Sequence, residues 1–470
     1  MKDAVVIGSG PNGLAAAVAL ARAGRSVLVL EAEETIGGGA RSSEITLPGF
    51  VHDLCSAVHP LAAASPFFRQ LPLERHGLKW IKPPLALAHP FDDATAACLS
   101  PSMEETEASL RSDGPAYRKL MQPFVDRWED AIDDLLRPPH LPRHPLLALR
   151  FGLKAMRSAT GLADALFREK WAKGLFGGNA AHSFLPLSQP PSAAIGLMLG
   201  LAGHAVGWPI PQGGSQKIAD ALASYLKELG GEIRTGVRVR SVSDIPEARS
   251  VFFDLQPEPL LAIAGDRLPA GYQNSLRRFR PGPAAFKMDF ALSGPVPWKA
   301  KECSKASTVH LGGTLEELAV SEAAPWAGRI AEKPYVLVAH LSPFDPTRAP
   351  SGKHTVWAYT HVPRGSTEDA TKRIEDQIER FAPGFRDLIV GKKATPPAEL
   401  ERRNANLVGG DISGGIADLW QILFRPRFSL SPYRMPVKGW YLCSAATPPG
   451  AGVHGLCGYY AAVLALRDGF

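Results

Sequence analysis

The chain has 470 residues, 45% of them hydrophobic and 21% charged, an ordinary composition for a soluble globular protein of roughly two or three domains. The formal net charge of +6 comes from scattered Lys and Arg residues rather than from a basic block, which argues against nucleic acid as a partner. The five cysteines form no Cys-x-x-Cys pair, so we expect neither a disulfide framework nor a metal site.

The apolar segments bear on localisation. We expect no targeting peptide, because an apolar strand-like stretch, residues 4–7, begins almost at Met1. The most apolar stretch, residues 193–208, contains His204 and is too short to span a bilayer. Widely spaced cysteines are typical of a reducing compartment. These features predict a cytoplasmic protein, either free in solution or in peripheral contact with a membrane.

The first residues carry the clearest motif. Residues 4–7 form a continuous apolar run, as in a parallel strand that is buried on both faces, and an alanine-rich helix is expected over residues 14–23. Between them lies a G-x-G-x-x-G pattern. In such a pattern Gly8 permits the tight turn, Gly10 allows a pyrophosphate to approach the backbone, and Gly13 allows close helix–strand packing. The phosphates then lie at a helix N-terminus, where free N–H groups favour anions.

A second strand completes this unit. It is expected over residues 26–30 and ends on Glu31, close to the spacing of about 20 residues at which a carboxylate binds a ribose hydroxyl. A glycine-rich turn without a ligand is the alternative. Because the glycine pattern follows a strand, opens a helix and is completed by a second strand with its acid, we interpret the segment as a dinucleotide-binding βαβ unit.

The next loop indicates which dinucleotide is bound. Residues 36–42 resemble the G-G-x-x-R-[ST] motif of a large flavin-binding family that contains amine oxidases and phytoene desaturases. Gly38 and Gly39 allow the loop to pass close to the dinucleotide, and Arg41 offers forked donors to a phosphate. The resemblance implies that the cofactor is FAD.

A middle segment extends the resemblance. A glycine-containing turn at residues 211–215 precedes an amphipathic helix expected over residues 217–229, and strands are expected at residues 232–234 and 237–239. In the family, the second of these strands places backbone groups against the adenine. The resemblance therefore implies an FAD contact at Val239, with a plain edge strand as the alternative.

The last segment contains a strand expected over residues 439–446, a glycine-rich loop over residues 447–455 and a helix over residues 456–466. A loop that leads into a helix N-terminus can place N–H donors against a flavin carbonyl and against the negative charge that reduction develops there. We expect flavin contacts from the strand end and the loop, at Ala446, Gly452, Val453 and His454.

The resemblance extends over nearly the whole chain and is strongest to the phytoene desaturase-related branch, the phytoene dehydrogenase-like oxidoreductases. It is also carried by residues 286–292, 310–314, 406–411 and 443–458. It implies an α/β fold in which a Rossmann-like, GR2-type FAD-binding domain is interleaved with a mixed α+β substrate-binding domain. The expected FAD-binding segments are residues 1–70, 211–265 and 430–470, and the substrate-binding segments are residues 71–210 and 266–429.

This resemblance also implies an activity. We expect an FAD-dependent oxidoreductase of the dehydrogenase or desaturase type that acts on an apolar, unsaturated substrate such as a carotenoid, another polyene or a lipid-like molecule. The reaction is either dehydrogenation by hydride transfer to flavin N5 or a flavin-assisted isomerisation. Electrons from a dehydrogenation pass to oxygen, a quinone or another acceptor. The alternatives are an amine oxidase-type flavoenzyme and a non-catalytic, flavin-stabilised binding or assembly protein.

Two residues are candidates for proton transfer. Lys287 lies in an apolar strand expected over residues 284–292, and a lysine on the matching strand of related amine oxidases reaches flavin N5 through a water. The alternative is a lysine that extends to solvent at the strand's edge. His454 has the chemistry to shuttle a proton, and its alternative is a loop histidine satisfied by backbone groups. We interpret Asp411 as the anchor of a turn.

One further helix is expected near residue 150. Its apolar residues fall on one stripe and its basic residues on an adjoining stripe: Leu146, Leu149, Leu153 and Met156, and Arg143, Arg150, Lys154 and Arg157. We interpret it as an ordinary helix of the substrate domain with a solvated basic edge. The alternative is a basic amphipathic helix at a membrane surface or at a lipid entrance.

Overall fold

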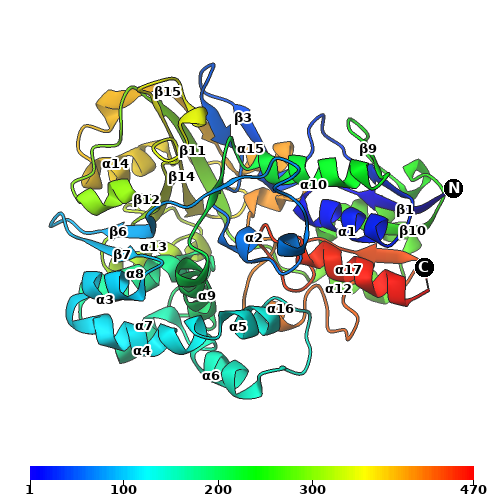
Figure 1. The fold of residues 1–470 in the computed structure, drawn as a ribbon, viewed down its shortest axis with the longest axis horizontal. Helices are drawn as coiled ribbons and strands as arrows, with labels where there is room; N and C mark the ends of the chain where they lie inside the picture. Colours follow the sequence, from blue (N-terminus) through cyan, green and yellow to red (C-terminus); the bar gives the residue numbers. More distant parts are fainter. Residues whose placement is uncertain (470) are drawn as a thin grey trace.

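The computed structural model describes residues 1–469 and contains two main sheets (Figure 1). The first is a parallel sheet of five strands in the order β16-β10-β1-β2-β9. Its strands are β1 (Lys2–Ile7), β2 (Val27–Leu30), β9 (Glu232–Arg234), β10 (Ala248–Phe253) and β16 (Trp440–Leu442). The strands come from three distant parts of the chain, as expected for an interleaved Rossmann-like domain.

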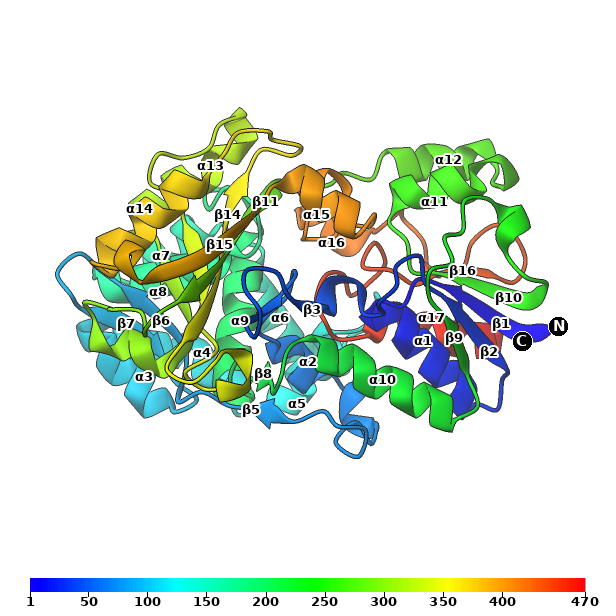
Figure 2. The same cartoon turned by 90° about the horizontal axis from the view of Figure 1, so that it is seen from above.

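Helices cover both faces of this sheet, on the right of Figure 2. One face packs against α1 (Pro11–Arg22), α10 (Gln216–Glu228) and α17 (Leu456–Arg467), and the other against α11 (Pro257–Ala264) and α12 (Ala270–Arg277). Alternate residues of β1 from Ala4 to Ile7 enter the two cores, which explains why this part of the strand is apolar throughout. The predicted boundary at residue 265 assigns α12 to the second domain, whereas α12 packs in the core of the first.

The second sheet has seven strands in the order β15-β11-β14-β13-β12-β6-β7, and only the β12–β6 pair is parallel among those described. The strands are β6 (Leu85–Pro90), β7 (Ala96–Leu99), β11 (Ala284–Leu292), β12 (Ala306–Leu311), β13 (Val336–Ala339), β14 (His354–Val362) and β15 (Ile389–Thr395). One face packs against α14 (Thr371–Phe381). Together the two sheets confirm the predicted α/β fold class.

A helical layer completes the second half, at the lower left of Figure 1. Its helices are α3 (Met103–Ser109), α4 (Gly114–Val125), α5 (Trp128–Leu135), α6 (Pro145–Ala155), α7 (Ala159–Leu166), α8 (Lys170–Ala181) and α9 (Ser192–Ala205). The remaining short elements are β3 (Ser42–Glu44), β4 (Val51–Asp53), α2 (Pro60–Ala64), β5 (Trp80–Ile81), β8 (Ile210–Pro211), α13 (Leu315–Ala323), α15 (Pro397–Arg403) and α16 (Leu419–Leu423). Across residues 1–469, we find no helix that combines the length and the apolarity needed to cross a bilayer.

Two predicted strands differ from the structure. Residues 237–239 form no strand, and Val237 N–H instead donates to the Glu31 carbonyl at 2.8 Å. The strand predicted over residues 439–446 is only β16, because the chain turns at Ser444, whose carbonyl accepts from Thr447 N–H at 2.9 Å. Val239 is buried and Val237 exposed, so the apolar residues of segment 237–239 do not indicate a strand ladder.

Candidate cofactor and substrate cavity

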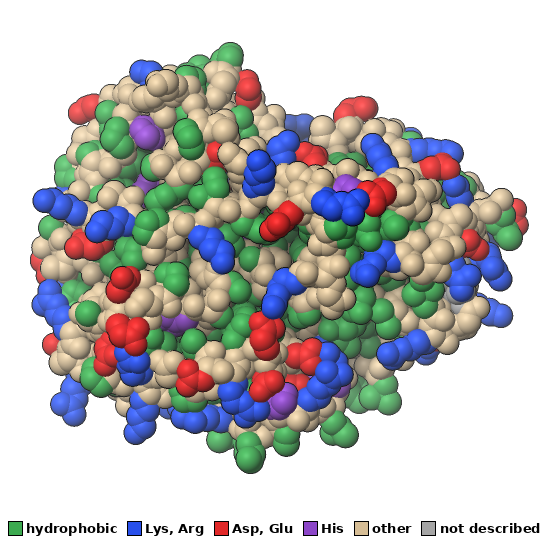
Figure 3. Space-filling view, viewed as in Figure 1, with side chains coloured by type: hydrophobic (Ala, Val, Ile, Leu, Met, Phe, Trp, Pro, Cys, Tyr) green, Lys and Arg blue, Asp and Glu red, His purple; other side chains and the backbone are tan. Residues whose placement is uncertain are grey.

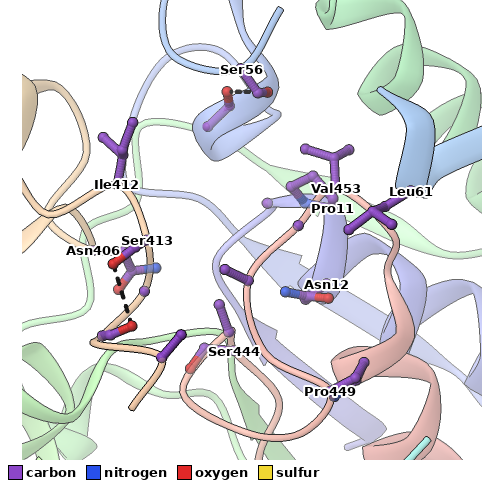
Figure 4. Close-up of a pocket in the computed structure, with 18 of the residues that line it drawn as sticks. Pro11, Asn12, Ser56, Leu61, Asn406, Ile412, Ser413, Ser444, Pro449 and Val453 are labelled. Carbon is purple, nitrogen blue, oxygen red and sulfur yellow. Dashed lines mark hydrogen bonds between the residues drawn. The ribbon is translucent and has the colours of Figure 1, made fainter. Parts of the chain in front are cut away.

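One cavity of about 1220 Å³ extends from the first sheet to the second. It exceeds the range of about 300–1,000 Å³ typical of small-molecule pockets, so it has room for a cofactor and a second ligand. Figure 4 shows the part at the start of α1, where Pro11 and Asn12 face Ser444 and Val453 of the C-terminal segment. Residues far apart in the chain therefore form one continuous wall.

The predicted glycines shape one end of this cavity. Gly8 has φ +99°, which favours glycine, and it lines the cavity with Gly10, the N-cap of α1. A Cβ on Gly10 would lie 2.8 Å from the Asp254 carboxylate, and one on Gly38 would lie 3.0 Å from the Gly10 Cα. Gly13 is outside the lining and packs against the Gly8 carbonyl, 2.1 Å from its ideal Cβ. The backbone is therefore bare where a diphosphate would approach.

Glu31 lies at the end of β2, on the cavity wall. One carboxylate oxygen accepts from the Ser9 backbone N–H at 2.9 Å and from the Ser9 hydroxyl, and the other accepts from Glu33 N–H at 2.9 Å. Val239 is buried nearby and also lines the cavity. The positions of both residues are compatible with the predicted contacts to the adenosine half of FAD.

Arg41 is a buried cation on the same wall. Its Nε donates to the Gly38 carbonyl at 3.0 Å and its Nη2 donates to the Arg403 carbonyl. Within the described chain it forms no ion pair, and the side-chain oxygen of cavity-lining Asn12 has no hydrogen-bond partner. A buried cation is costly unless an anion compensates it, so Arg41 fits the diphosphate of a dinucleotide, whereas the Asn12 oxygen requires a donor.

Asp254 is a cavity residue that our sequence reasoning did not identify as functional. It follows β10 directly, and its carboxylate accepts from Gly13 N–H at 2.9 Å. Burial, opposed by that hydrogen bond and assisted by the charge of Glu31, raises the pKa of Asp254 to about 7. The available signal was its position at the carboxyl end of a parallel strand, where ligands of such sheets bind.

The C-terminal loop contributes only part of its predicted contacts. Gly452 and Val453 line the cavity, whereas Ala446 is buried behind the neighbouring Ser444 and Ala445. His454 also lies outside the lining. Its Nδ1 accepts from Leu456 N–H at 3.0 Å, its carbonyl accepts from the Ser65 hydroxyl at 2.7 Å, and burial lowers its pKa to about 4. The geometry gives His454 a role in holding the loop.

Lys287 lies behind the cavity wall rather than in it. It is 2% exposed on β11, an interior strand, so it does not extend to solvent at a sheet edge. Its Nζ donates to the Asp289 carboxylate and lies 5.7 Å from the centroid of the Trp357 ring. Burial lowers the pKa of Lys287, against the attraction of Asp289. Trp357 and Tyr359, on the adjacent β14, line the cavity instead.

The other half of the cavity is mainly apolar. Its wall includes Leu147, Phe151, Ile195, Met198, Leu199 and Leu337. The Asp411 carboxylate accepts from the N–H groups of Gly282, Ser413 and Gly415 at 2.8, 2.6 and 2.8 Å, which confirms its interpretation as a turn anchor. The turn that it holds places Ser413 and Gly414 on the cavity wall.

An exposed apolar surface borders this half of the cavity, and we call it the apolar rim. It consists of Leu146, Leu149, Leu153 and Met156 on and after α6, with Trp420 and Leu423 on α16. Leu146 is 81% and Leu153 69% exposed, while the opposite face of α6 is buried at Leu147 and Phe151. Figure 3 shows hydrophobic side chains along the lower edge of the molecule, where Figure 1 places α6. Met156 and Leu423 both also line the cavity.

Comparisons with known proteins agree with this geometry. Residues 6–71 match the family described as NAD(P)-binding Rossmann-like domain. The chain is 27% identical to pyridine nucleotide-disulfide oxidoreductase domain-containing protein 2 of Rattus norvegicus, over 99% of this chain and 93% of the relative. It is 25% identical to phytoene desaturase (neurosporene-forming) of Rhodobacter capsulatus, over 97% of this chain and 92% of the relative. The chain is related to the phytoene desaturases.

The fold of the chain also matches a solved structure, an oxidoreductase from Methanosarcina mazei, with a TM-score of 0.67, 16% identity and coverage of 99% of both chains. The predicted oxidoreductase class is confirmed by relatives of this kind. Despite the name of the rat protein, Cys55, Cys98, Cys303, Cys443 and Cys457 are all free.

Proposed function

We propose that the protein is an FAD-dependent oxidoreductase that acts on an apolar, unsaturated substrate. The observation that carries this proposal is the continuity of the cavity, because the bare glycine backbone, Arg41 and the apolar wall border one space. When bound, FAD supplies an acceptor for a hydride at N5. Arg41 and the start of α1 hold the diphosphate, Glu31 binds the ribose, and the backbone of Gly452 and Val453 faces the flavin.

The apolar wall has two tasks in this reaction. It binds the hydrocarbon part of the substrate and excludes water from the carbon that loses a hydride. In a dehydrogenation, one C–H bond gives up its electron pair with the hydride, the adjacent carbon loses a proton, and a double bond forms. The electrons then leave the protein to oxygen, a quinone or another carrier. A cis/trans isomerisation of the same substrate involves no net loss of electrons.

Amine oxidation is the second candidate function. Tyr459 and Tyr460, two aromatic residues adjacent in the sequence, lie outside the cavity lining, and Tyr459 stacks on Phe67 with ring centroids 4.5 Å apart. A different pair does line the cavity: Trp357 and Tyr359, with centroids 5.1 Å apart and planes at 77°. This pair is the observation that favours an amine substrate.

We also propose that the apolar rim contacts the surface of a membrane that contains anionic lipids. Exposed leucines next to a cavity mouth provide a route for an apolar substrate that avoids water. Basic side chains lie on the same helix or next to it: Arg143, Arg150, Lys154 and Arg157. Each basic residue near an anionic surface adds attraction, so charge and apolar area act together.

An anaerobic titration tests the proposed reaction. We expect the absorbance of oxidised flavin to bleach when a detergent-solubilised polyene is added to the purified, FAD-loaded protein. Bleaching by amines but not by polyenes would assign the amine oxidase function. If neither class bleaches the flavin and no polyene isomers form, the catalytic proposal is wrong and a flavin-stabilised binding protein replaces it.

A further inference from the structure

Two polar side chains on the cavity wall have no partner. Thr308 on β12 is 1% exposed and Trp357 on β14 is 8% exposed, and both line the cavity. Within residues 1–469, neither the Thr308 hydroxyl nor the Trp357 indole N–H finds a hydrogen-bond partner. Buried polar groups are normally hydrogen-bonded, so an unpaired donor on a residue that lines a cavity indicates a ligand.

The strand register places these two side chains on the same face of the sheet. Thr308 lies opposite Ala339 of β13, and Ala339 lies opposite Trp357. Two strand spacings separate the outer residues by about 10 Å between their Cα atoms. Ala339, which lies between them, is buried and outside the cavity lining. We call Thr308 and Trp357 the polar wall.

The chemistry of these residues defines the group that they accept. An indole N–H only donates, and a threonine hydroxyl donates or accepts, so the ligand group must be an acceptor. The charged side chains next to Trp357 are Lys287 and Asp289, of which Asp289 lies opposite Trp357 in the sheet, and these two pair with each other. Among the described residues, the polar wall therefore has no unpaired cation for a carboxylate, and the group that fits is a neutral oxygen.

We propose that the polar wall binds a neutral oxygen, a hydroxyl or carbonyl group, at one end of an otherwise apolar substrate. The cavity then selects an oxygenated chain over the hydrocarbon of the same skeleton. The inference rests on the proposed function because it specifies the substrate of that cavity. It adds that the substrate is an amphiphile whose polar group binds at the second sheet.

Binding of two matched probes to the FAD-loaded protein tests this inference. We expect farnesol, an unsaturated alcohol, to bind about tenfold more tightly than farnesene, the corresponding hydrocarbon, in equilibrium dialysis with detergent. Thr308→Val and Trp357→Phe each remove one hydrogen bond, so we expect each to lower farnesol affinity about 3- to 10-fold more than it lowers farnesene affinity.

Matched control variants are available in the half of the molecule that contains the second sheet. The Thr395 hydroxyl and the Trp298 indole N–H are also without partners among the described residues, yet both side chains lie outside the cavity lining. Thr395→Val and Trp298→Phe should therefore leave the preference for farnesol unchanged. If these controls reduce the preference as much as the cavity variants do, the polar wall is not the binding site.

Equal affinity of the unaltered protein for farnesol and farnesene would overturn the inference. An equal loss of affinity for both probes in Thr308→Val would overturn it as well, because that result indicates a packing defect. Failure of the proposed redox function can be distinguished from failure of this inference. If no polyene bleaches the flavin, the relative affinity for farnesol and farnesene can still be measured. The converse result is that a polyene hydrocarbon bleaches the flavin while farnesol binds no more tightly than farnesene. That result would contradict the proposed role of the polar wall and leave the proposed redox function intact.

Discussion

Asp254 shows how one buried carboxyl links the cofactor cavity to pH. Its usual pKa of 3.8 rises to about 7, mainly because burial disfavours the charged form. Between these values the unfolded chain releases the proton while the folded chain keeps it. The sign is therefore the reverse of that for a salt-bridged carboxylate, and Asp254 lowers the stability of the folded protein progressively from about pH 4 to about pH 7.

Asp254→Asn removes this ionisation and keeps an oxygen that accepts from Gly13 N–H. We expect the variant to gain stability over the unaltered protein as pH rises, by about 2–3 kcal/mol between pH 4.5 and pH 8. Urea denaturation at the two pH values measures the difference. A stability difference that is the same at both pH values would contradict the raised pKa.

At the residue scale, the sequence predicts the glycines of the cofactor site better than it predicts the residues that carry out the reaction. Gly8, Gly10 and Gly38 follow from local turns and close approaches, and the cavity lining includes all three. The orientation of Lys287 depends instead on Asp289 and on β14, whose partners are distant in the chain. A buried lysine beside a carboxylate two residues later in the same strand has no local signature that separates it from a catalytic lysine.

The helix α6 is the element in which sequence pattern and structure differ most instructively. The sequence pattern identifies an apolar stripe, and from it we interpret the segment as an ordinary helix of the substrate domain with a solvated basic edge. In the structure that stripe is the solvent-exposed apolar rim, while Leu147 and Phe151 on the other face are buried. A helix with apolar residues on two faces allows either face to be buried, and only its neighbours decide which one is.

A triple substitution tests the role of the apolar rim. Leu146→Ser, Leu149→Ser and Leu153→Ser together should lower binding to vesicles of phosphatidylcholine and phosphatidylserine by at least about tenfold, because each leucine loses burial in the lipid. Co-sedimentation measures the loss, and the free energy of unfolding should change little because the three side chains are exposed.

Val320→Ser is the matched control, since Val320 is 71% exposed on α13, outside the apolar rim. Vesicle binding of this variant should equal that of the unaltered protein. The membrane proposal fails if the unaltered protein does not bind anionic vesicles, or if the triple variant binds them equally well.

At the scale of the whole molecule, a buried ionic network ties β4 and the start of α10 to the second half of the chain. Arg348 donates to Asp53 at 2.9 Å and to Asp345 at 3.0 Å, and it is 1% exposed. Asp53 also accepts from Ser215 N–H at 2.8 Å, at the start of α10. Two segments predicted in the FAD-binding domain and one predicted in the substrate-binding domain are therefore joined through Arg348 and Asp53.

Arg348→Met leaves two buried carboxylates without their cation, so we expect a loss of about 3–5 kcal/mol in the free energy of unfolding. Chemical denaturation measures it. Arg364→Met breaks the exposed pair with Glu258, whose side chains are 45% and 71% exposed, and should cost less than about 1 kcal/mol. Similar losses of unfolding free energy in the two variants would show that the buried network contributes no more stability than an exposed ion pair.

The overall architecture follows from sequence more readily than the contacts between its parts. The five-stranded sheet is encoded by continuous apolar runs and glycine turns, so its assembly from three segments is predictable. The single cavity across both sheets depends on how α6, α9 and β14 pack against the cofactor half, which no local pattern records. The same limit applies to Arg425, a buried cavity residue whose Nη2 donates to the Gly414 carbonyl at 3.1 Å.

The central claim, an FAD site at the start of α1, is tested most directly by the visible spectrum of the purified protein with added FAD. We predict the bands of oxidised flavin in stoichiometric amount, and their loss in Arg41→Met, because the diphosphate then lacks its buried cation. Arg364→Met, on the surface, should retain the colour. A folded, colourless protein that takes up no FAD would contradict the account.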